Sequence, residues 1–191
     1  MTQNEDTGEE LTTEAANERS THLDELSPLE LDKLMNREDH EVVSAVDAVA
    51  PRIAAAIEAV ASALGGGGRL LYLGAGTSGR LGVLDAAECP PTFSTDPELV
   101  QGLIAGGQDA VTCAIEGAED DAASGRKDLQ AVGLSKQDAV VGISASGRTP
   151  YVLGGLQYAS EFGATSIGIC CNRNAPLADA CQIQIELLVG P

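Results

Sequence analysis

Short apolar runs alternate with stretches of helical periodicity along most of the chain. The apolar runs, each followed by small or polar residues, predict strands at 69–74, 100–106, 139–144, 165–171 and 182–189. Helices are expected between them, at about 77–88, 107–131, 149–162 and 174–180. Buried strands that alternate with helices form right-handed βαβ units. The pattern therefore predicts an α/β fold in which a parallel β-sheet is flanked by helices.

A longer helical pattern precedes the first strand. Apolar residues recur at three- and four-residue steps from Val42 to Leu64, which indicates one helical face. Pro51 should kink this helix or start a new one, and the glycines at 65–68 should end it. A helix that covers the core is the simplest interpretation. A subunit interface is the alternative, because the apolar face is long.

Charge separates the beginning of the chain from the rest. The 191 residues carry a net charge of −18, and residues 1–41 hold 13 acidic and 3 basic side chains. We therefore expect an acidic, partly flexible N-terminal segment with short helices at 1–41, and an α/β domain at 42–191. An acidic surface repels phosphate backbones and anionic lipids, so neither nucleic acid nor a membrane is an expected partner.

The cysteines and histidines do not form a metal-binding pattern. The five cysteines contain no C-x-x-C pair, and His22 and His40 both lie in the acidic segment, so no metal site is expected. The first ten residues, MTQNEDTGEE, have neither the basic nor the apolar region of a signal peptide. No uncharged apolar run reaches the length of about 18 residues that a membrane span needs. We expect a cytoplasmic protein with reduced thiols.

Two loops share a tripeptide. Residues 74–80 follow the first predicted strand, residues 144–149 follow the third, and each loop contains Ser-Gly-Arg. Glycines expose backbone N–H groups, a helix N-terminus attracts anions, and hydroxyls add neutral donors. Ligands of parallel sheets bind at the carboxyl ends of strands. The loops therefore predict a site for one phosphorylated small molecule, with candidate contacts from Thr77, Ser78, Gly79, Ser144, Ser146, Gly147 and Thr149.

Two other interpretations fit these loops. Residues 74–79 also satisfy G-x-G-x-x-G, the dinucleotide fingerprint, which requires an acidic residue at the end of the next strand. That strand ends in Ala-Gly-Gly at 105–107, so a nicotinamide cofactor is not expected. Ordinary turns remain the other interpretation, because glycine and serine are common in them.

Two groups of acids lie near the predicted site. Glu88 precedes Cys89 and the pair Pro90-Pro91, which is expected to stop the helix, to push Cys89 out of the α region and to point Glu88 toward the first loop. The sequence EGAEDD supplies Glu116 and Glu119, with Gly117 interrupting the helical pattern. Two converging glutamates can divide acid and base roles. A solvated surface is the alternative for both groups.

Several of these segments together resemble one family. The two loops, LDAAECPPTF, GLIAGG, EGAED and VVGISASGRTPYV resemble N-acetylmuramic acid 6-phosphate etherases, which belong to the sugar-isomerase (SIS) domain group with glucokinase regulatory protein. The resemblance runs from Leu11 to Pro191. It implies an SIS-type fold with helices on both sides of the sheet, a homodimer and no cofactor. Family members continue with further helices, so it also implies that this chain lacks the C-terminal part.

The resemblance implies a reaction and its residues. N-acetylmuramate 6-phosphate would be cleaved at its D-lactyl ether to N-acetylglucosamine 6-phosphate and D-lactate, in cell-wall amino-sugar recycling. The family's acid/base glutamate corresponds to Glu88 and its second glutamate to Glu119. The sugar-phosphate contacts correspond to Thr77, Ser78, Ser144, Ser146 and Thr149. Removal of the proton at C2 and loss of lactate from C3 need only acid–base groups. A non-catalytic sugar-phosphate-binding module and an aldose–ketose isomerase remain the alternatives.

Overall fold

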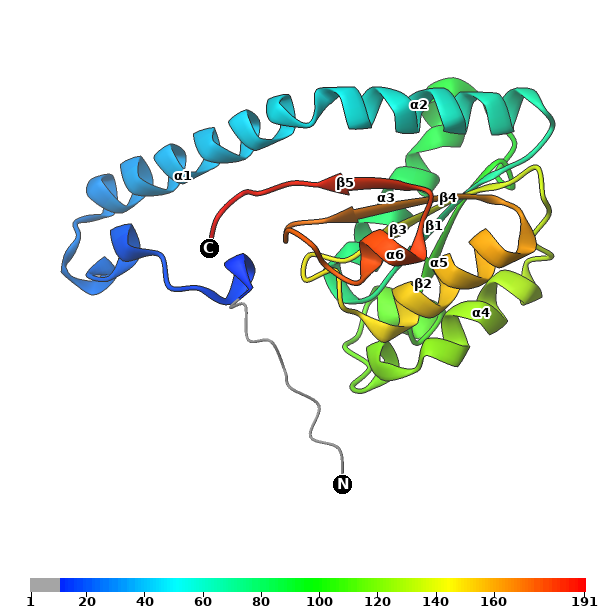
Figure 1. The fold of residues 1–191 in the computed structure, drawn as a ribbon. Helices are drawn as coiled ribbons and strands as arrows, with labels where there is room; N and C mark the ends of the chain where they lie inside the picture. Colours follow the sequence, from blue (N-terminus) through cyan, green and yellow to red (C-terminus); the bar gives the residue numbers. More distant parts are fainter. Residues whose placement is uncertain (1–10) are drawn as a thin grey trace.

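The computed structural model describes residues 11–191 and is built around a five-stranded parallel sheet with helices on both faces (Figure 1). The strands follow the order β2-β1-β3-β4-β5. They are β1 (Leu70–Gly74), β2 (Val100–Ile104), β3 (Ala139–Ile143), β4 (Thr165–Cys170) and β5 (Ile183–Glu186). The α/β class, the parallel sheet and all the predicted strands are confirmed.

The helices form two layers. Helices α2 (Ala50–Gly65) and α3 (Gly76–Phe93) pack on one face of the sheet. Helices α4 (Ala122–Ala131), α5 (Pro150–Phe162) and α6 (Leu177–Ala180) pack on the other. The side chains of both cores are almost all Ala, Val, Ile and Leu, as expected of a chain with 3% aromatic residues. Close helix–sheet contact follows from these small and branched side chains.

Helix α1 (Pro28–Ala48) leaves the body of the molecule (Figure 1). Ser27 caps it, because the Glu30 N–H donates to the Ser27 hydroxyl and the Ser27 N–H donates to the Glu30 carboxylate. The helix runs through positions 41 and 42 without a break. It ends before Val49, and α2 begins with Pro51 in its first turn, at an angle of 63°. The predicted break at Pro51 is confirmed.

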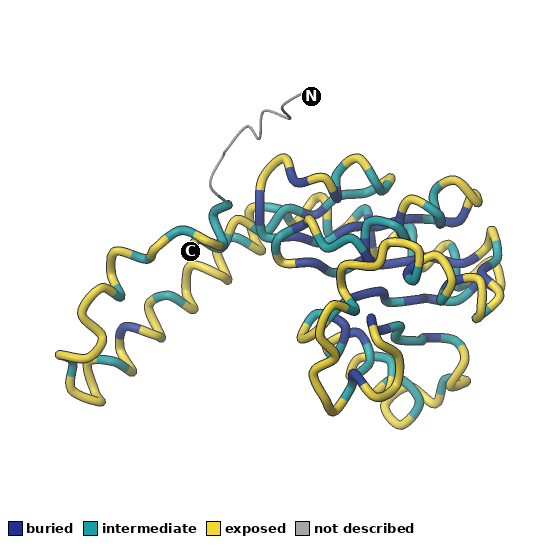
Figure 2. The backbone as a smooth tube through the Cα atoms, turned by 90° about the horizontal axis from the view of Figure 1, so that it is seen from below, coloured by how far each residue is buried: buried dark blue, intermediate teal, exposed yellow. Residues whose placement is uncertain are grey.

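That bend divides the apolar face predicted for 42–64. Val49, Ile53, Val60 and Leu64 pack against the sheet. Val42 and Val46, on the other side of the bend, are 43% and 40% exposed, and Figure 2 shows this part of the chain projecting from the body. The expectation of one continuous face is therefore wrong. Within residues 11–191 no single helix is long and apolar enough to span a membrane, although α1 and α2 pass that test together as a bent pair.

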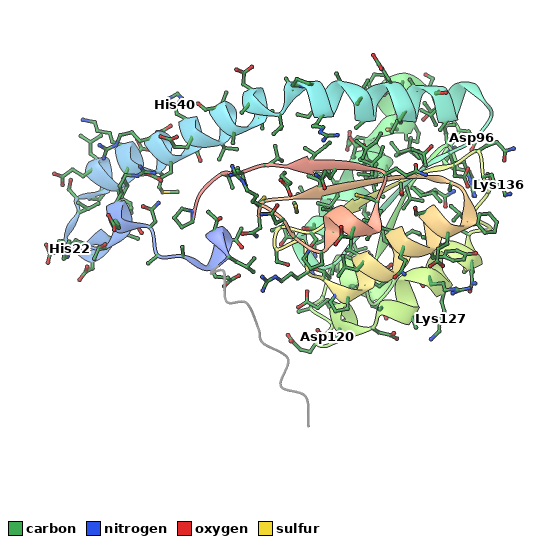
Figure 3. All side chains as sticks on the ribbon, viewed as in Figure 1. His22, His40, Asp96, Asp120, Lys127 and Lys136 are labelled. Carbon is green, nitrogen blue, oxygen red and sulfur yellow. The ribbon has the colours of Figure 1, made fainter. Side chains whose placement is uncertain are left out.

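The first described residues fold back along α1. They form the 3₁₀ turns η1 (Thr12–Glu14), η2 (Glu18–Ser20) and η3 (Leu23–Glu25). Arg19 pairs with Glu38 of α1, with 2.7 Å between Nε and Oε1, and the Asn17 amide donates to the same carboxylate. We call residues 11–48 the arm. His22 lies at its outer end and His40 on α1 (Figure 3).

Two predicted helices are shorter than expected. Only α4 is an α-helix within 107–131. The residues before it form the 3₁₀ turns η4 (Gln108–Val111) and η5 (Ala118–Asp120), because Gly107 and Gly117 adopt positive φ angles of 71° and 72°. Asp121 then caps α4 by accepting from the Ala123 and Ser124 N–H groups. In the predicted helix at 174–180, only α6 is helical.

Helix α3 is longer than expected. It continues through Pro90 and Pro91 to Phe93 and ends at Ser94, whose φ is 56°. The expected stop at the prolines is wrong, and Cys89 is helical as well. A proline ring fixes φ near the helical value, and the two missing N–H groups fall in the last turn, so the axis continues at the cost of two hydrogen bonds. Glu88 therefore lies within a helix and not at a proline corner.

Candidate functional site

The two Ser-Gly-Arg loops lie next to each other at one edge of the sheet. We call residues 74–80 the β1 loop and residues 144–149 the β3 loop. Strands β1 and β3 are neighbours, with Gly74 beside Ile143. The chain passes from β1 to β2 on one side and then to β3 on the other, so the strand order reverses between the loops. Open parallel sheets bind ligands at such a reversal, outside the carboxyl ends of the strands.

The β1 loop places the start of α3 directly on the end of β1. A Cβ added to Gly79 would lie 2.7 Å from the Gly74 carbonyl oxygen and 2.6 Å from Cγ1 of Ile104. This contact leaves room only for glycine at position 79. Thr77 is exposed and Ser78 is half-buried, and neither hydroxyl has a hydrogen-bond partner among residues 11–191. As far as residues 11–191 are concerned, both hydroxyls are free for a ligand at the helix N-terminus.

The β3 loop is held by its own hydroxyls. The buried Ser144 hydroxyl accepts from the Gly147 N–H at 3.0 Å and lies 2.8 Å from the Thr149 hydroxyl. Ser146 accepts from the Arg148 N–H at 3.1 Å. Gly147 has a φ of +68°, and a Cβ there would lie 2.5 Å from the Ala175 Cβ. Ser144 and Gly147 thus shape the loop, and the half-buried Ser146 and Thr149 are its accessible hydroxyls.

The arginines of the two tripeptides differ in their bonding. Arg80 donates from Nε to the Val111 carbonyl at 3.0 Å and from Nη2 to the Cys113 carbonyl at 3.1 Å. It therefore ties the β1 loop to the segment that carries Glu119. Arg148 is exposed, and its guanidinium has no hydrogen bond or ion pair within the described part of the chain. No feature of the tripeptide itself distinguishes these roles, so the sequence did not predict them.

A small cavity joins the β1 loop to the acidic segment. Its volume is ≈170 Å³, and Gly76, Arg80, Glu116 and Glu119 are among the residues that line it. The structure thus brings Glu119 to the first loop. The cavity is smaller than the roughly 300–1,000 Å³ of most ligand sites.

Glu88 is not brought to this cavity. It lies twelve residues beyond Gly76 in α3, which is about 18 Å along the helix axis. Thr77, Leu81, Leu84 and Glu88 form one exposed stripe on α3, in which Leu81 and Leu84 are 55% and 58% exposed. The expectation that Glu88 opens onto the β1 loop of its own chain therefore does not hold.

The thiols behind the β3 loop are not activated nucleophiles. Cys170 is buried at the end of β4, and burial raises the pKa of its thiol. Burial likewise raises the pKa of the next residue, Cys171. Because the thiolate is the reactive form of cysteine, neither side chain suits covalent catalysis. The chemistry of this edge of the sheet rests on hydroxyls, backbone N–H groups, arginine and glutamate.

Comparison with known proteins agrees with this architecture. The family model for the glucokinase regulatory protein N-terminal SIS domain matches residues 29–160. Among solved structures, the phosphoheptose isomerase of Francisella tularensis superimposes with a TM-score of 0.63 at 20% identity, covering 85% of this chain and 86% of that one. The enzyme of Neisseria gonorrhoeae gives 0.65 at 20% identity, covering 83% and 84%. At these identities the likeness concerns the fold alone.

Curated relatives are much closer in sequence. N-acetylmuramic acid 6-phosphate etherase 2 of Lactiplantibacillus plantarum is 55% identical over 183 residues, which cover 96% of this chain and 62% of that protein. The N-acetylmuramic acid 6-phosphate etherase of Vibrio vulnificus is 55% identical over 181 residues, covering 95% and 60%. The chain thus spans about 60% of the length of these relatives. The family-model match over residues 29–160, together with the fold, shows that the chain belongs to the SIS-domain family represented by the N-terminal SIS domain of glucokinase regulatory protein.

Proposed function

We propose that this chain is the SIS domain of a cytoplasmic carbon–oxygen lyase that cleaves the D-lactyl ether of N-acetylmuramate 6-phosphate. The products would be N-acetylglucosamine 6-phosphate and D-lactate, in recycling of cell-wall amino sugars. The observation that carries the proposal is the pairing of two Ser-Gly-Arg loops on neighbouring strands. The names of the 55%-identical relatives supply the substrate. Five unpaired cysteines support a reducing compartment.

The phosphate would bind between the two loops. Thr77, Ser78, Ser146 and Thr149 offer hydroxyls, and the N-terminus of α3 offers backbone N–H groups and a partial positive charge. Arg148 adds a guanidinium with no partner inside the described chain, which suits an anionic ligand. This arrangement anchors the 6-phosphate and leaves the other end of the sugar toward Glu119.

The reaction is then an elimination followed by addition of water. In the open-chain sugar, the proton at C2 is acidic because C2 is next to the aldehyde, and a carboxylate removes it. The electron pair forms the C2–C3 double bond, and lactate leaves from C3 with the pair of the C–O bond and a proton from an acid. Water adds to the same double bond. We assign removal of the C2 proton to Glu88. We assign protonation of the leaving lactate, or activation of the water, to Glu119.

A homodimer explains how Glu88 can take part. Along the exposed stripe of α3, Thr77 lies four residues before Leu81, and Glu88 lies four residues after Leu84. The stripe therefore has the same spacing from either end. Two copies of α3 packed antiparallel around a two-fold axis would cover Leu81 with Leu84 of the partner subunit. The same packing would place Glu88 of the partner subunit beside Thr77 and enlarge the ≈170 Å³ cavity into a shared site.

Release of D-lactate from N-acetylmuramate 6-phosphate tests the activity. Glu88→Gln and Glu119→Gln should each lower the rate by about 10²–10⁴. Glu161→Gln, on the opposite face, is the matched control and should keep the parent rate. If the sugar phosphate binds without reaction, the chain is a binding module; if it is only interconverted between aldose and ketose, the chain is an isomerase.

Mixing the two inactive variants tests the shared site. A heterodimer of Glu88→Gln with Glu119→Gln contains one site with both glutamates if Glu88 acts across the interface. After subunit exchange, an equal mixture should recover about a quarter of the parent rate. No recovery, with exchange verified by differently sized tags, would contradict the crossed arrangement.

A further inference from the structure

Asn172 connects three segments that are distant in sequence. It follows β4, is 2% exposed, and its side chain reaches both the β3 loop and the start of the arm. Its Nδ2 lies 3.1 Å from the Ala145 carbonyl, 3.4 Å from the Ser146 carbonyl and 3.0 Å from the Thr13 hydroxyl. Its Oδ1 accepts the Thr13 N–H at 3.3 Å. The amide thus has hydrogen-bond partners on both its donor and its acceptor side.

Among the hydrogen bonds of residues 11–191, those of the Asn172 side chain link the β3 loop to the arm. Other bonds hold the loop from the β4 side: the Cys171 N–H donates to Ala145 at 2.8 Å, and the Leu177 N–H donates to Gly147 at 3.1 Å. Asn172 adds the bonds that continue to Thr13, which lies 159 positions away in the chain. When a buried amide loses one hydrogen-bond partner, its unpaired N–H or C=O group stays buried without a bond, which costs free energy. The bonds of Asn172 to the loop and to Thr13 therefore reinforce each other.

We infer that Asn172 is a positioning residue for the β3 loop, and that residues 11–14 act as a strap that fixes the loop through Thr13. In this arrangement Asn172 does not touch the ligand. It holds the carbonyls of Ala145 and Ser146, and so fixes the direction of the Ser146 hydroxyl and the N–H groups that follow. The consequence for ligand affinity rests on the proposed function, because it assumes that this loop binds the phosphate.

Thr13→Val is the informative substitution, because it keeps the shape of the side chain and removes the hydroxyl that Asn172 contacts. Thr13 is only half-buried, so this variant should fold, whereas changes at the buried Asn172 can disturb the core. Thr13→Ser keeps a hydroxyl at this position and should behave like the parent. Thr12→Val is the matched control: the same change one residue earlier, at a hydroxyl with no hydrogen bond among residues 11–191.

Amide hydrogen exchange at Gly147 and Arg148 decides the inference. Both N–H groups are bonded inside the loop, so their exchange reports its opening. In Thr13→Val we expect exchange there to rise about fivefold, the effect of one ordinary hydrogen bond, while Leu71 and Val140 in the sheet are unchanged. Thr13→Ser and Thr12→Val should match the parent. Unchanged exchange at both positions, or an equal rise throughout the sheet, would overturn the inference.

Calorimetric titration with N-acetylglucosamine 6-phosphate separates this inference from the proposed function. If both hold, Thr13→Val should bind more weakly than the parent, by up to about fivefold, and Thr12→Val should bind equally well. If the exchange results are as expected but the parent itself does not bind the sugar phosphate, the strap stands and the proposed function fails.

Discussion

Gly79→Ala should affect stability in two opposite ways: the alanine favours the helix, but its side chain collides with the sheet. Position 79 lies in the first turns of α3, where alanine is favoured over glycine by about 1 kcal/mol. The added Cβ, however, would lie 2.7 Å from the Gly74 carbonyl oxygen and 3.0 Å from its carbon. Those atoms belong to β1 and have no rotamer to change. The start of α3 must therefore move away from the sheet by about half an ångström or more.

The contact should outweigh the helix propensity. Overpacking a close-packed site costs up to about 3 kcal/mol, so a net loss of about 1–2 kcal/mol remains after the gain in propensity. The β1 loop moves with the helix, so weaker binding of the sugar phosphate should accompany the loss.

Urea unfolding followed by circular dichroism measures this effect. With a slope of about 2 kcal/mol per molar urea, the midpoint should fall by about 0.5–1 M. Gly65→Ala at the end of α2 is the control, because no atom lies within 4 Å of the added Cβ. It should leave the midpoint unchanged or slightly raised. A Gly79→Ala protein as stable as the Gly65→Ala protein would refute the argument that backbone contact fixes this glycine.

Two further predictions concern stability. Asp138 is 1% exposed; burial raises its pKa, but hydrogen bonds from Arg69 and the Ser135 N–H outweigh burial and hold the pKa below its ordinary value. The stabilisation is therefore complete above the unfolded-state pKa of about 4 and is lost as the pH falls through the lower folded pKa. Asp138→Asn should lower the free energy of unfolding by about 3 kcal/mol at pH 7 and make it fall less between pH 7 and pH 3, as urea unfolding at the two pH values would show. An equal fall in the free energy of unfolding for the parent and the variant would contradict this. Pro90→Ala should stabilise α3 by about 1–2 kcal/mol in the same assay, because it restores a backbone donor; an unchanged midpoint would mean that the proline costs nothing there.

The features that could be predicted from the sequence, such as the strands, depend on patterns among residues that are close in the chain. The strands are predictable because each apolar run is bounded by glycine or polar residues. The adjacency of the two loops follows once β1 and β3 are neighbours in a parallel sheet. The proline rule failed at Pro90, because α3 packs along β1 and β2 and this contact maintains the helix. The bend before α2 divided an apolar face that periodicity alone shows as continuous.

The missed site residues have long-range partners. Arg80 bonds to carbonyls more than thirty positions away, and Asn172 to Thr13 across 159 positions. No local sequence pattern around Arg80 or Asn172 specifies the partner of its side chain. Glu88 is a different case, because its distance from the β1 loop needs no long-range partner: a helix over 77–88, as predicted, already places Glu88 about 18 Å along the axis from Gly76.

The arm is joined to the body at both ends. It leaves through the bend into α2, and its first described residues return to the β3 loop at Asn172 (Figure 1). Most of α1 between these points is exposed, with Leu34 as its buried residue. If docking of Thr13 fixes the β3 loop as inferred above, the arm and the loop are thermodynamically linked sites. Any molecule that binds the arm only while Thr13 is docked must raise the affinity of the loop for its ligand, and that ligand must raise the affinity of the arm by the same factor.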